Sequence, residues 1–321
     1  MGCLIPFYSI ACSVQTPNAS GANSGQPLSV GISAWAGFKG HYVATDKNYF
    51  GEENLKVAEQ NFPSFTDLNT ALTAGKVDLG WVGGTDLIQL AQQNPNLRII
   101  MMSDYSDGAD AIAGRGITKP EDLRGKKLAR EDIPYEMVFV GEYLKKAGLT
   151  EKDVEIVPLT APDGAAAYAT GKVDAVATYE PFLSMALKEG KGEVIFSTKG
   201  TSIIPNVLAT SAQVIQERRE EVLAYMRAVG KGVEFADANP EDAAKIVAAK
   251  IGVKPEEIPA QLAGIATKNI QQNKDIPFNN DSPMSLLSSM KAAATTLHKL
   301  GKTPQLVDVN TLIDSSLIQS L

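Results

Sequence analysis

One four-residue string, Gly-Lys-Val-Asp, occurs twice in this chain, and its surroundings limit the folds that the chain can adopt. The first copy lies in "ALTAGKVDLGWVGGTD", which contains Gly75, and the second in "AYATGKVDAVATYEPF", which contains Gly171. In each copy an alanine-rich run ends at the glycine, as helices commonly do. The apolar run that begins at the valine is typical of a buried strand. We therefore expect one helix–turn–strand unit in each of two α/β lobes, with the Lys and Asp as solvated turn residues.

Strand-like and helix-like segments alternate along the chain on both sides of these two copies. Helical segments separate strand-like ones, and after residue 211 the pattern becomes helical to the end of the chain. Such alternation indicates parallel βαβ units. The strand-like segments are 27–35, 55–62, 76–82, 97–104, 126–130, 154–159, 172–179 and 192–198.

Composition limits the functions that this chain can have. A length of 321 residues suits two domains or lobes, and the net charge of −7 argues against a nucleic-acid partner. Cys3 and Cys12 are the only cysteines, and there are two histidines, so we expect no disulfide framework, no metal site and no cofactor. No nucleophile–base pair or phosphate-binding glycine loop is visible, so we do not expect an enzyme.

The N-terminal 27 residues read as a targeting segment rather than as part of the fold. The apolar stretch "MGCLIPFYSIAC" resembles a bacterial lipobox that ends at Cys12, which we expect to carry lipid. The alternative is an arbitrary apolar N-terminus without a signal function. Residues 13–27 are rich in Ser, Asn, Gly and Pro and predict a flexible tether. The expected location is the periplasm or the outer face of the plasma membrane.

Several longer motifs give the chain a family resemblance. "ISAWAGF", "TALTAGKVDLGWVGGTD", "YATGKVDAVATYEPF" and "NVLATS" together resemble the periplasmic solute-binding proteins of ABC importers, in the nitrate, sulfonate and taurine branch. The resemblance implies a two-lobed periplasmic-binding-protein fold of the type II kind, with two crossing strands as a hinge. It implies lobe 1 at 28–108 and 205–321, and lobe 2 at 109–204. It further implies a monomer that closes on a small molecule and delivers it to ABC permease and ATPase subunits.

Ligands of open α/β sheets bind beyond the carboxyl ends of the strands, so the loops there are the candidate site. These loops are rich in acids, whereas an anion site would offer small residues at helix N-termini. We therefore expect a small cationic ligand such as guanidine or a guanidino or amidine-like compound. Carboxylates would pair with its N–H groups, and aromatic rings would stack on it. The candidate residues are Trp35, Asp86, Asp107, Asp110, Asp132, Glu136, Tyr179 and Glu180.

Each candidate has a structural alternative. Asp86 and Asp132 could cap the helices that follow them, and Asp107 and Asp110 could hold the hinge backbone. Glu136 would lie in the first turn of a helix beginning at Pro134, where a negative charge suits the helix dipole. Arg130 opposes the cation hypothesis, unless it neutralises a neighbouring acid. The alternative ligands are a small anion (alkanesulfonate or taurine, nitrate, bicarbonate) and a pyrimidine-like neutral solute.

Overall fold

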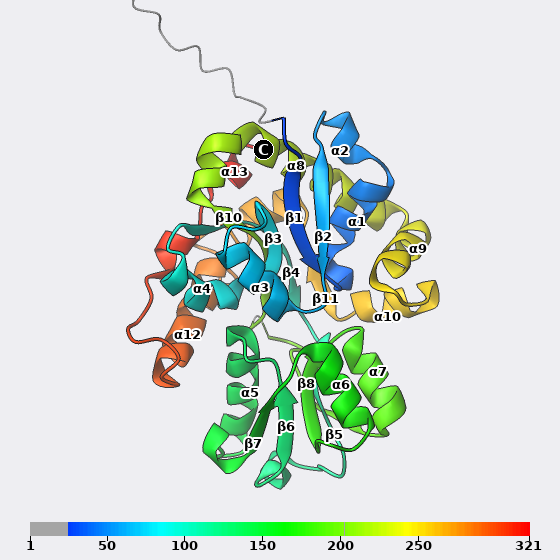
Figure 1. The fold of residues 1–321 in the computed structure, drawn as a ribbon, viewed down its shortest axis with the longest axis vertical. Helices are drawn as coiled ribbons and strands as arrows, with labels where there is room; N and C mark the ends of the chain where they lie inside the picture. Colours follow the sequence, from blue (N-terminus) through cyan, green and yellow to red (C-terminus); the bar gives the residue numbers. More distant parts are fainter. Residues whose placement is uncertain (1–24, 202) are drawn as a thin grey trace, which may run out of the picture.

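The computed structural model describes residues 25–201 and 203–321 and contains two β-sheets, each covered by helices. Figure 1 shows the two resulting lobes one above the other, with the larger lobe at the top and the smaller one, coloured mainly green, below. This arrangement confirms the expected two-lobed α/β fold. The predicted targeting segment, including Cys12, lies almost entirely outside the described residues.

The larger lobe is built on a six-stranded sheet of mixed direction. Its strand order is β11-β4-β10-β3-β1-β2, in which β1 is parallel to β2 and β3, whereas β10 is antiparallel to both of its neighbours. The strand bounds are β1 Leu28–Ser33, β2 Val57–Phe62, β3 Leu79–Gly83, β4 Leu97–Ser106, β10 Pro205–Ser211 and β11 Ile265–Thr267. The first helices of this lobe are α1 Lys39–Asp46, α2 Tyr49–Glu52, α3 Phe65–Thr73 and α4 Leu87–Gln93.

The smaller lobe repeats this plan with a five-stranded sheet in the order β7-β6-β8-β5-β9. Strands β6, β7 and β8 are parallel, and β5 is antiparallel to β8 and β9. The strand bounds are β5 Asp110–Gly114, β6 Lys127–Arg130, β7 Glu155–Pro158, β8 Ala175–Tyr179 and β9 Glu193–Ser197. The helices are α5 Pro134–Lys146, α6 Ala161–Ala169 and α7 Phe182–Gly190.

The chain passes between the two sheets at residues 107–109 and 198–204, and hydrogen bonds tie these crossings together. The hydroxyl groups of Ser106 and Thr198 lie 2.8 Å apart, and Asp107 Oδ1 accepts a 2.6 Å bond from the amide of Gly200. The strands that adjoin the crossings are antiparallel to their neighbours, which is why neither sheet is purely parallel as the alternation of elements suggested.

The repeated Asp has the same structural role in both lobes. Asp78 Oδ2 accepts hydrogen bonds from both the amide and the hydroxyl of Ser29 at the start of β1, and Asp174 Oδ2 accepts one from the amide of Lys127 at the start of β6. Each Asp therefore holds the first residues of the neighbouring parallel strand. The expectation that Asp78 is merely a solvated turn residue is wrong, because its side chain is half-buried and bonded.

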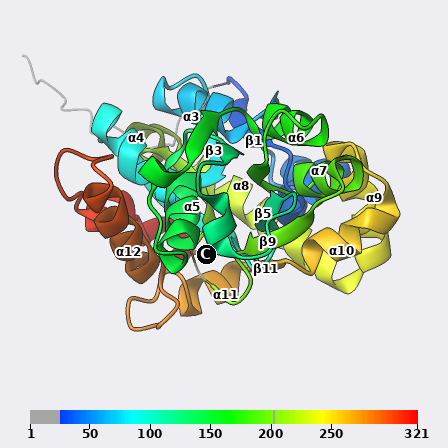
Figure 2. The same ribbon diagram turned by 90° about the horizontal axis from the view of Figure 1, so that it is seen from below.

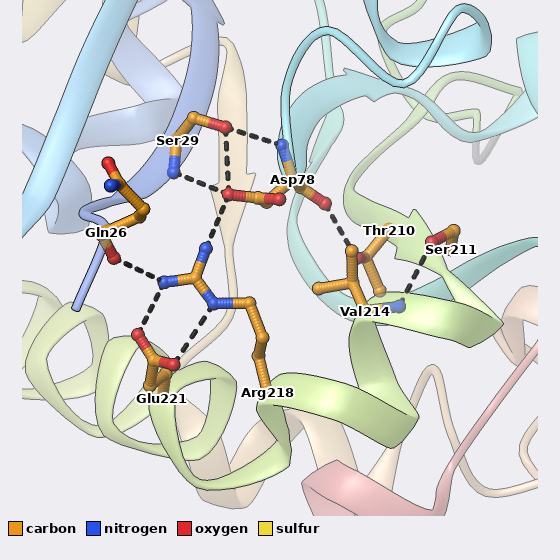
Figure 3. A network of polar contacts seen from close by, with 8 residues as sticks. All are labelled: Gln26, Ser29, Asp78, Thr210, Ser211, Val214, Arg218 and Glu221. Carbon is orange, nitrogen blue, oxygen red and sulfur yellow. Dashed lines mark hydrogen bonds and ion pairs between the residues drawn. The ribbon is translucent and has the colours of Figure 1, made fainter. Parts of the chain in front are cut away.

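In the larger lobe the side chain of Arg218 also binds Asp78, as Figure 3 shows. Arg218 donates to Asp78 Oδ2 at 2.9 Å, to the carbonyl oxygen of Gln26, and to the carboxylate of Glu221. Arg218 has non-helical dihedral angles, φ −130° and ψ 27°, within α8 Ala212–Ala238. The network thus joins the beginning of β1, the loop before β3 and a kinked helix.

We expect Asp78→Ala to destabilise the protein by about 2–3 kcal/mol, because it removes a half-buried charge-assisted contact and leaves Ser29 and Arg218 short of an acceptor. Asp174→Ala removes the matching contact in the other lobe, where no arginine is involved, and should lower the free energy of unfolding by only about 1 kcal/mol. Urea unfolding of both variants measures the difference. Equal losses would contradict the role assigned to Arg218.

The C-terminal region is mainly helical, as expected, but it includes a short strand that the pattern did not predict. The helices are α8, α9 Pro240–Ile251, α10 Ile258–Leu262, α11 Ile270–Asp275, α12 Leu286–Lys299 and α13 Ser316–Gln319. Strand β11 pairs with the edge of β4. Helix α12 packs against α5 of the smaller lobe, and the view from below in Figure 2 places the two helices side by side. None of the described helices has the length and apolarity needed to span a membrane.

Candidate ligand site between the lobes

Four aromatic side chains meet where the two lobes face each other. Trp35 and Phe65 belong to the larger lobe, and Tyr135 and Tyr179 to the smaller one. The ring of Tyr179 lies 6.2 Å from that of Trp35 and 5.2 Å from that of Phe65, and Phe65 lies 6.3 Å from Tyr135, between ring centroids. All four side chains are buried. Aromatic contacts therefore cross from one lobe to the other.

Trp35 is held in place by a buried carboxylate that was not among the candidates. Its indole Nε1 donates to Asp104 at 3.2 Å, and Asp104 also accepts from Asn206 Nδ2 at 2.9 Å and from the Ser103 hydroxyl at 2.7 Å. Both Asp104 and Asn206 lie on the strands that lead to the crossings. Asp104 is thus a positioning residue for the Trp35 ring, whose only hydrogen-bond donor is used.

Three buried acids of the smaller lobe, Asp110, Glu131 and Glu136, form what we call the acidic cluster. They are 4%, 2% and 1% exposed, and each has a carboxylate oxygen without a hydrogen-bond partner: Asp110 Oδ2, Glu131 Oε2 and Glu136 Oε1. The buried hydroxyl of Tyr135 likewise has no partner, whereas that of Tyr179 interacts with the backbone of Phe65. Buried polar atoms normally have partners, so several such atoms in one region indicate a ligand site.

The local backbone explains how two of these acids are oriented. Glu136 lies in the first turn of α5, and its Oε2 accepts a 2.6 Å hydrogen bond from the amide of Glu131. Glu131 Oε1 in turn accepts a 3.1 Å bond from the amide of Ala161 at the start of α6. Each carboxylate is thus fixed through one oxygen, and the other oxygen is left for a further partner.

Burial dominates the electrostatics of the acidic cluster. Desolvation raises the pKa of Asp110 to about 7 and that of Glu131 to about 8, and the pKa of Glu136 is raised well above its usual value. The charge of Glu131 and that of Asp110 add to the effect on Glu136. Negative charge is therefore unfavourable here unless a positive charge arrives.

The neighbouring cation, Arg130, is already engaged with other groups. Its Nη1 donates to Asp132 at 3.1 Å and to the carbonyl oxygen of Glu131, and its Nη2 donates to Glu151 at 3.2 Å. Asp132 itself is 64% exposed at its side chain. Arg130 thus neutralises acids beside the site, as one sequence hypothesis stated, although its buried Nε has no partner.

The other three candidates have structural partners. Asp86 is fully buried, and it accepts hydrogen bonds from Asn69 Nδ2 at 2.7 Å and from the amide of Tyr135 at 3.0 Å. Asp107 accepts a hydrogen bond from the amide of Gly200 in the second crossing. Glu180 accepts hydrogen bonds from the amide and hydroxyl of Ser184 in the first turn of α7. Of the eight candidates, the structure brings four together between the lobes, namely Trp35, Asp110, Glu136 and Tyr179. Asp86 connects the two lobes through its hydrogen bond to the amide of Tyr135.

Sequence reasoning missed Phe65, Glu131 and Tyr135 as candidates. Glu131 was visible as the residue that directly follows the strand ending at Arg130, and Tyr135 as the second residue of the next helix. Phe65 directly follows Ser64, the N-cap of α3. Their positions next to the end of a strand or the start of a helix could therefore have identified these three residues as candidates.

The described residues offer neither a metal site nor a free histidine at this position. Within 25–201 and 203–321 no group of three or more His, Cys, Asp or Glu side chains is placed to hold a metal ion. His41 is fully buried in the larger lobe, where its ring nitrogens contact Tyr225 Oη at 2.7 Å and Glu59 Oε2 at 2.9 Å. Its role is structural.

Comparison with known proteins decides the family. The family model described as NMT1/THI5 like matches residues 35–243 of this chain. The chain belongs to the NMT1/THI5-like family. The curated relatives that match this chain are named as binding proteins and not as enzymes, which agrees with the expectation from the sequence.

Individual relatives agree with this assignment. A provisionally named aliphatic sulfonates-binding protein of Bacillus subtilis is 22% identical over 285 residues, which cover 86% of this chain and 83% of the relative. The taurine-binding periplasmic protein of Escherichia coli is 29% identical over 151 residues, covering 46% of this chain and 47% of that protein. The solved alkanesulfonate-binding protein SsuA of Xanthomonas axonopodis, bound to MOPS, has a TM-score of 0.75 at 18% identity and covers 91% of this chain and 99% of its own. This last likeness confirms the fold.

Proposed function

We propose that this chain is the extracytoplasmic substrate-binding component of an ABC importer and that it captures a small cation rich in N–H donors, such as guanidinium or a guanidino compound. The observation that carries the cation is the acidic cluster, in which three buried carboxylates each have an oxygen without a hydrogen-bond partner. The names of the relatives mention a periplasmic location, and one of them names an ABC transporter, which supports the location and the importer role.

The chemistry of the cluster suits a planar, multiply donating cation. A guanidinium group offers five or six N–H donors in one plane, and it pairs with carboxylates through two parallel hydrogen bonds. Trp35, Phe65 and Tyr179 supply aromatic faces at the same place, which attract cations. A ligand with these features would satisfy the unpartnered oxygens and offset the cost of burying them.

The second candidate is a small anion, namely taurine, an alkanesulfonate, nitrate or bicarbonate. The names of the relatives favour this class over the cation. Two features of the chain favour it as well. The buried Nε of Arg130 is unpartnered, and the raised pKa values leave the acids able to donate hydrogen bonds in their protonated form. An anion would then be held by neutral carboxyl and hydroxyl groups rather than by opposite charge.

A calorimetric panel at pH 8 distinguishes the two candidates. We expect guanidinium and agmatine to bind with micromolar dissociation constants, corresponding to about −8 kcal/mol, and taurine and nitrate to show no heat. Sodium and potassium chloride at the same ionic strength serve as controls for nonspecific charge effects. Binding of taurine without binding of guanidinium would overturn the cation and support the second candidate.

A further inference from the structure

A contact between the lobes that involves no ligand atom stands out beside the acidic cluster. Asp86 lies just beyond β3 of the larger lobe, in the "GGTD" segment that follows the first Gly-Lys-Val-Asp copy. Its Oδ1 accepts a 3.0 Å hydrogen bond from the amide of Tyr135, which is the second residue of α5 in the smaller lobe. The contact therefore exists only while the lobes are together.

The helix that receives this contact lacks a cap of its own. The N-cap position of α5 is Ile133, whose side chain makes no capping hydrogen bond, and the next residue, Pro134, has no N–H group. The amide of Tyr135 is thus the first donor at this helix end, where an accepting side chain and a negative charge are most favourable. Asp86 supplies the acceptor from the other lobe, and it supplies the charge above the pKa of about 7 to which burial raises it.

Two further features fit Asp86 to this role. Its Oδ2 accepts a 2.7 Å bond from Asn69 of α3, so its orientation is fixed from within its own lobe. Gly83 at the end of β3 lets α5 approach, because a methyl group there would lie 3.0 Å from Cδ1 of Tyr135. Such a contact is tighter than side chains normally make.

We propose that Asp86 is a clasp that caps α5 across the lobes and thereby favours the closed state in the absence of ligand. The proposal does not depend on the ligand's charge. In the closed state α5 is capped, and on opening it loses that cap. The free energy of the contact therefore biases the open–closed equilibrium before any ligand arrives, and it raises the apparent affinity for every ligand that needs the closed state.

The clasp can be tested by measuring the distance between the lobes. The full chain carrying Cys3→Ser and Cys12→Ser accepts spin labels at Gln60→Cys in β2 and Lys188→Cys in α7, because it has no other cysteines and both positions are exposed. In the ligand-free protein, Asp86→Ala should shift the distance distribution measured by pulsed electron spin resonance towards longer values. An unchanged distribution would overturn the proposal.

Matched variants separate the clasp from other effects. Asp86→Asn should keep most of the closed population, because the new amide oxygen still accepts from Tyr135, and the unpartnered Oδ1 of Asn69 can turn to accept from the new amide. Ser211→Ala removes a cap within the larger lobe, at the start of α8, and should leave the distances unchanged. Gly83→Ala should open the lobes as Asp86→Ala does, which provides a second test if that variant folds poorly.

Binding provides an independent readout with guanidinium and taurine as probes. Asp86→Ala should raise the dissociation constant of whichever probe binds by roughly tenfold, and Asp86→Asn by no more than about threefold. If Asp86 instead contacted a cation directly, loss of its charge in Asp86→Asn would weaken guanidinium binding as strongly as Asp86→Ala, and this result would overturn the clasp. If neither probe binds, the proposed function fails, whereas the distance measurement still tests the clasp.

Discussion

Replacing Glu136 with glutamine is expected to weaken guanidinium binding about a hundredfold while making the ligand-free protein more stable. Truncating one partner of a buried charge pair costs roughly 2–5 kcal/mol of binding free energy. The gain in stability has a separate cause. Burial raises the pKa of Glu136 well above its usual value, so folding favours the protonated form of this acid, whereas glutamine needs no proton.

The geometry favours a clean result for this substitution. Glutamine has the same shape as glutamate, and its carbonyl oxygen can still accept the hydrogen bond from the amide of Glu131. The local backbone at the start of α5 should therefore be unchanged. We expect the free energy of unfolding to rise, because the neutral glutamine side chain can be buried without taking up a proton.

Calorimetry and urea unfolding on the same preparation measure both effects. Asp132→Asn is the matched control, since it removes a carboxylate from the same loop, but one that is exposed and paired with Arg130. It should leave guanidinium binding within about twofold of the parent, because the Asp132 side chain is exposed to solvent and lies outside the acidic cluster. Normal guanidinium binding by Glu136→Gln would show that the acidic cluster does not hold the ligand.

The fold was predictable from the sequence because its signals are local and repeated. The glycines that end alanine-rich runs, followed by buried apolar runs, identified both lobes. The helices ending near Gly75 and Gly171 lie where they were expected. The short strand β11 was not predictable. It has three residues, and its strand character comes from pairing with the edge of β4, which the local sequence does not reveal.

The site was only partly predictable, because strand ends identify a region and not the direction of a side chain. Asp132 and Glu131 are neighbours in one loop, yet one side chain points to solvent and the other is buried. Which of them enters the site depends on the helix that starts at Pro134 and on the amide of Ala161, a residue distant in sequence. The same limit applies to Asp104, whose contact with Trp35 depends on how β4 packs beside β10.

The sign of the pH dependence of binding should separate the cation from the anion most sharply. In the ligand-free protein, burial raises the pKa of Asp110 to about 7 and that of Glu131 to about 8, so both acids carry protons at pH 6. A cation binds the charged forms and expels these protons. Its affinity should therefore rise between pH 6 and pH 8, by up to about tenfold per pH unit for each carboxyl group that is deprotonated on binding.

The same linkage predicts how the ligand-free protein responds to pH. A carboxyl group whose pKa is raised on folding contributes stability at low pH, and this contribution is lost as the pH rises towards the folded-state value. His41 acts in the opposite sense, because burial lowers its pKa and the unfolded chain takes up a proton more readily below pH 6.5. Since the three acids outnumber this one histidine, we expect the melting temperature without ligand to fall between pH 5.5 and pH 8.

Calorimetric titration with guanidinium in two buffers of different ionisation enthalpy, at pH 6.5 and pH 8, counts the protons released on binding. We expect more than one proton to be released at pH 6.5 and fewer at pH 8, with the affinity rising over the same interval. In Glu131→Gln the release at pH 6.5 should fall by nearly one proton. An anionic ligand would require the acids in their protonated form, so its binding would take up protons and weaken as the pH rises. Proton uptake on binding, or an affinity that falls towards pH 8, would therefore contradict a cation held by Asp110, Glu131 and Glu136.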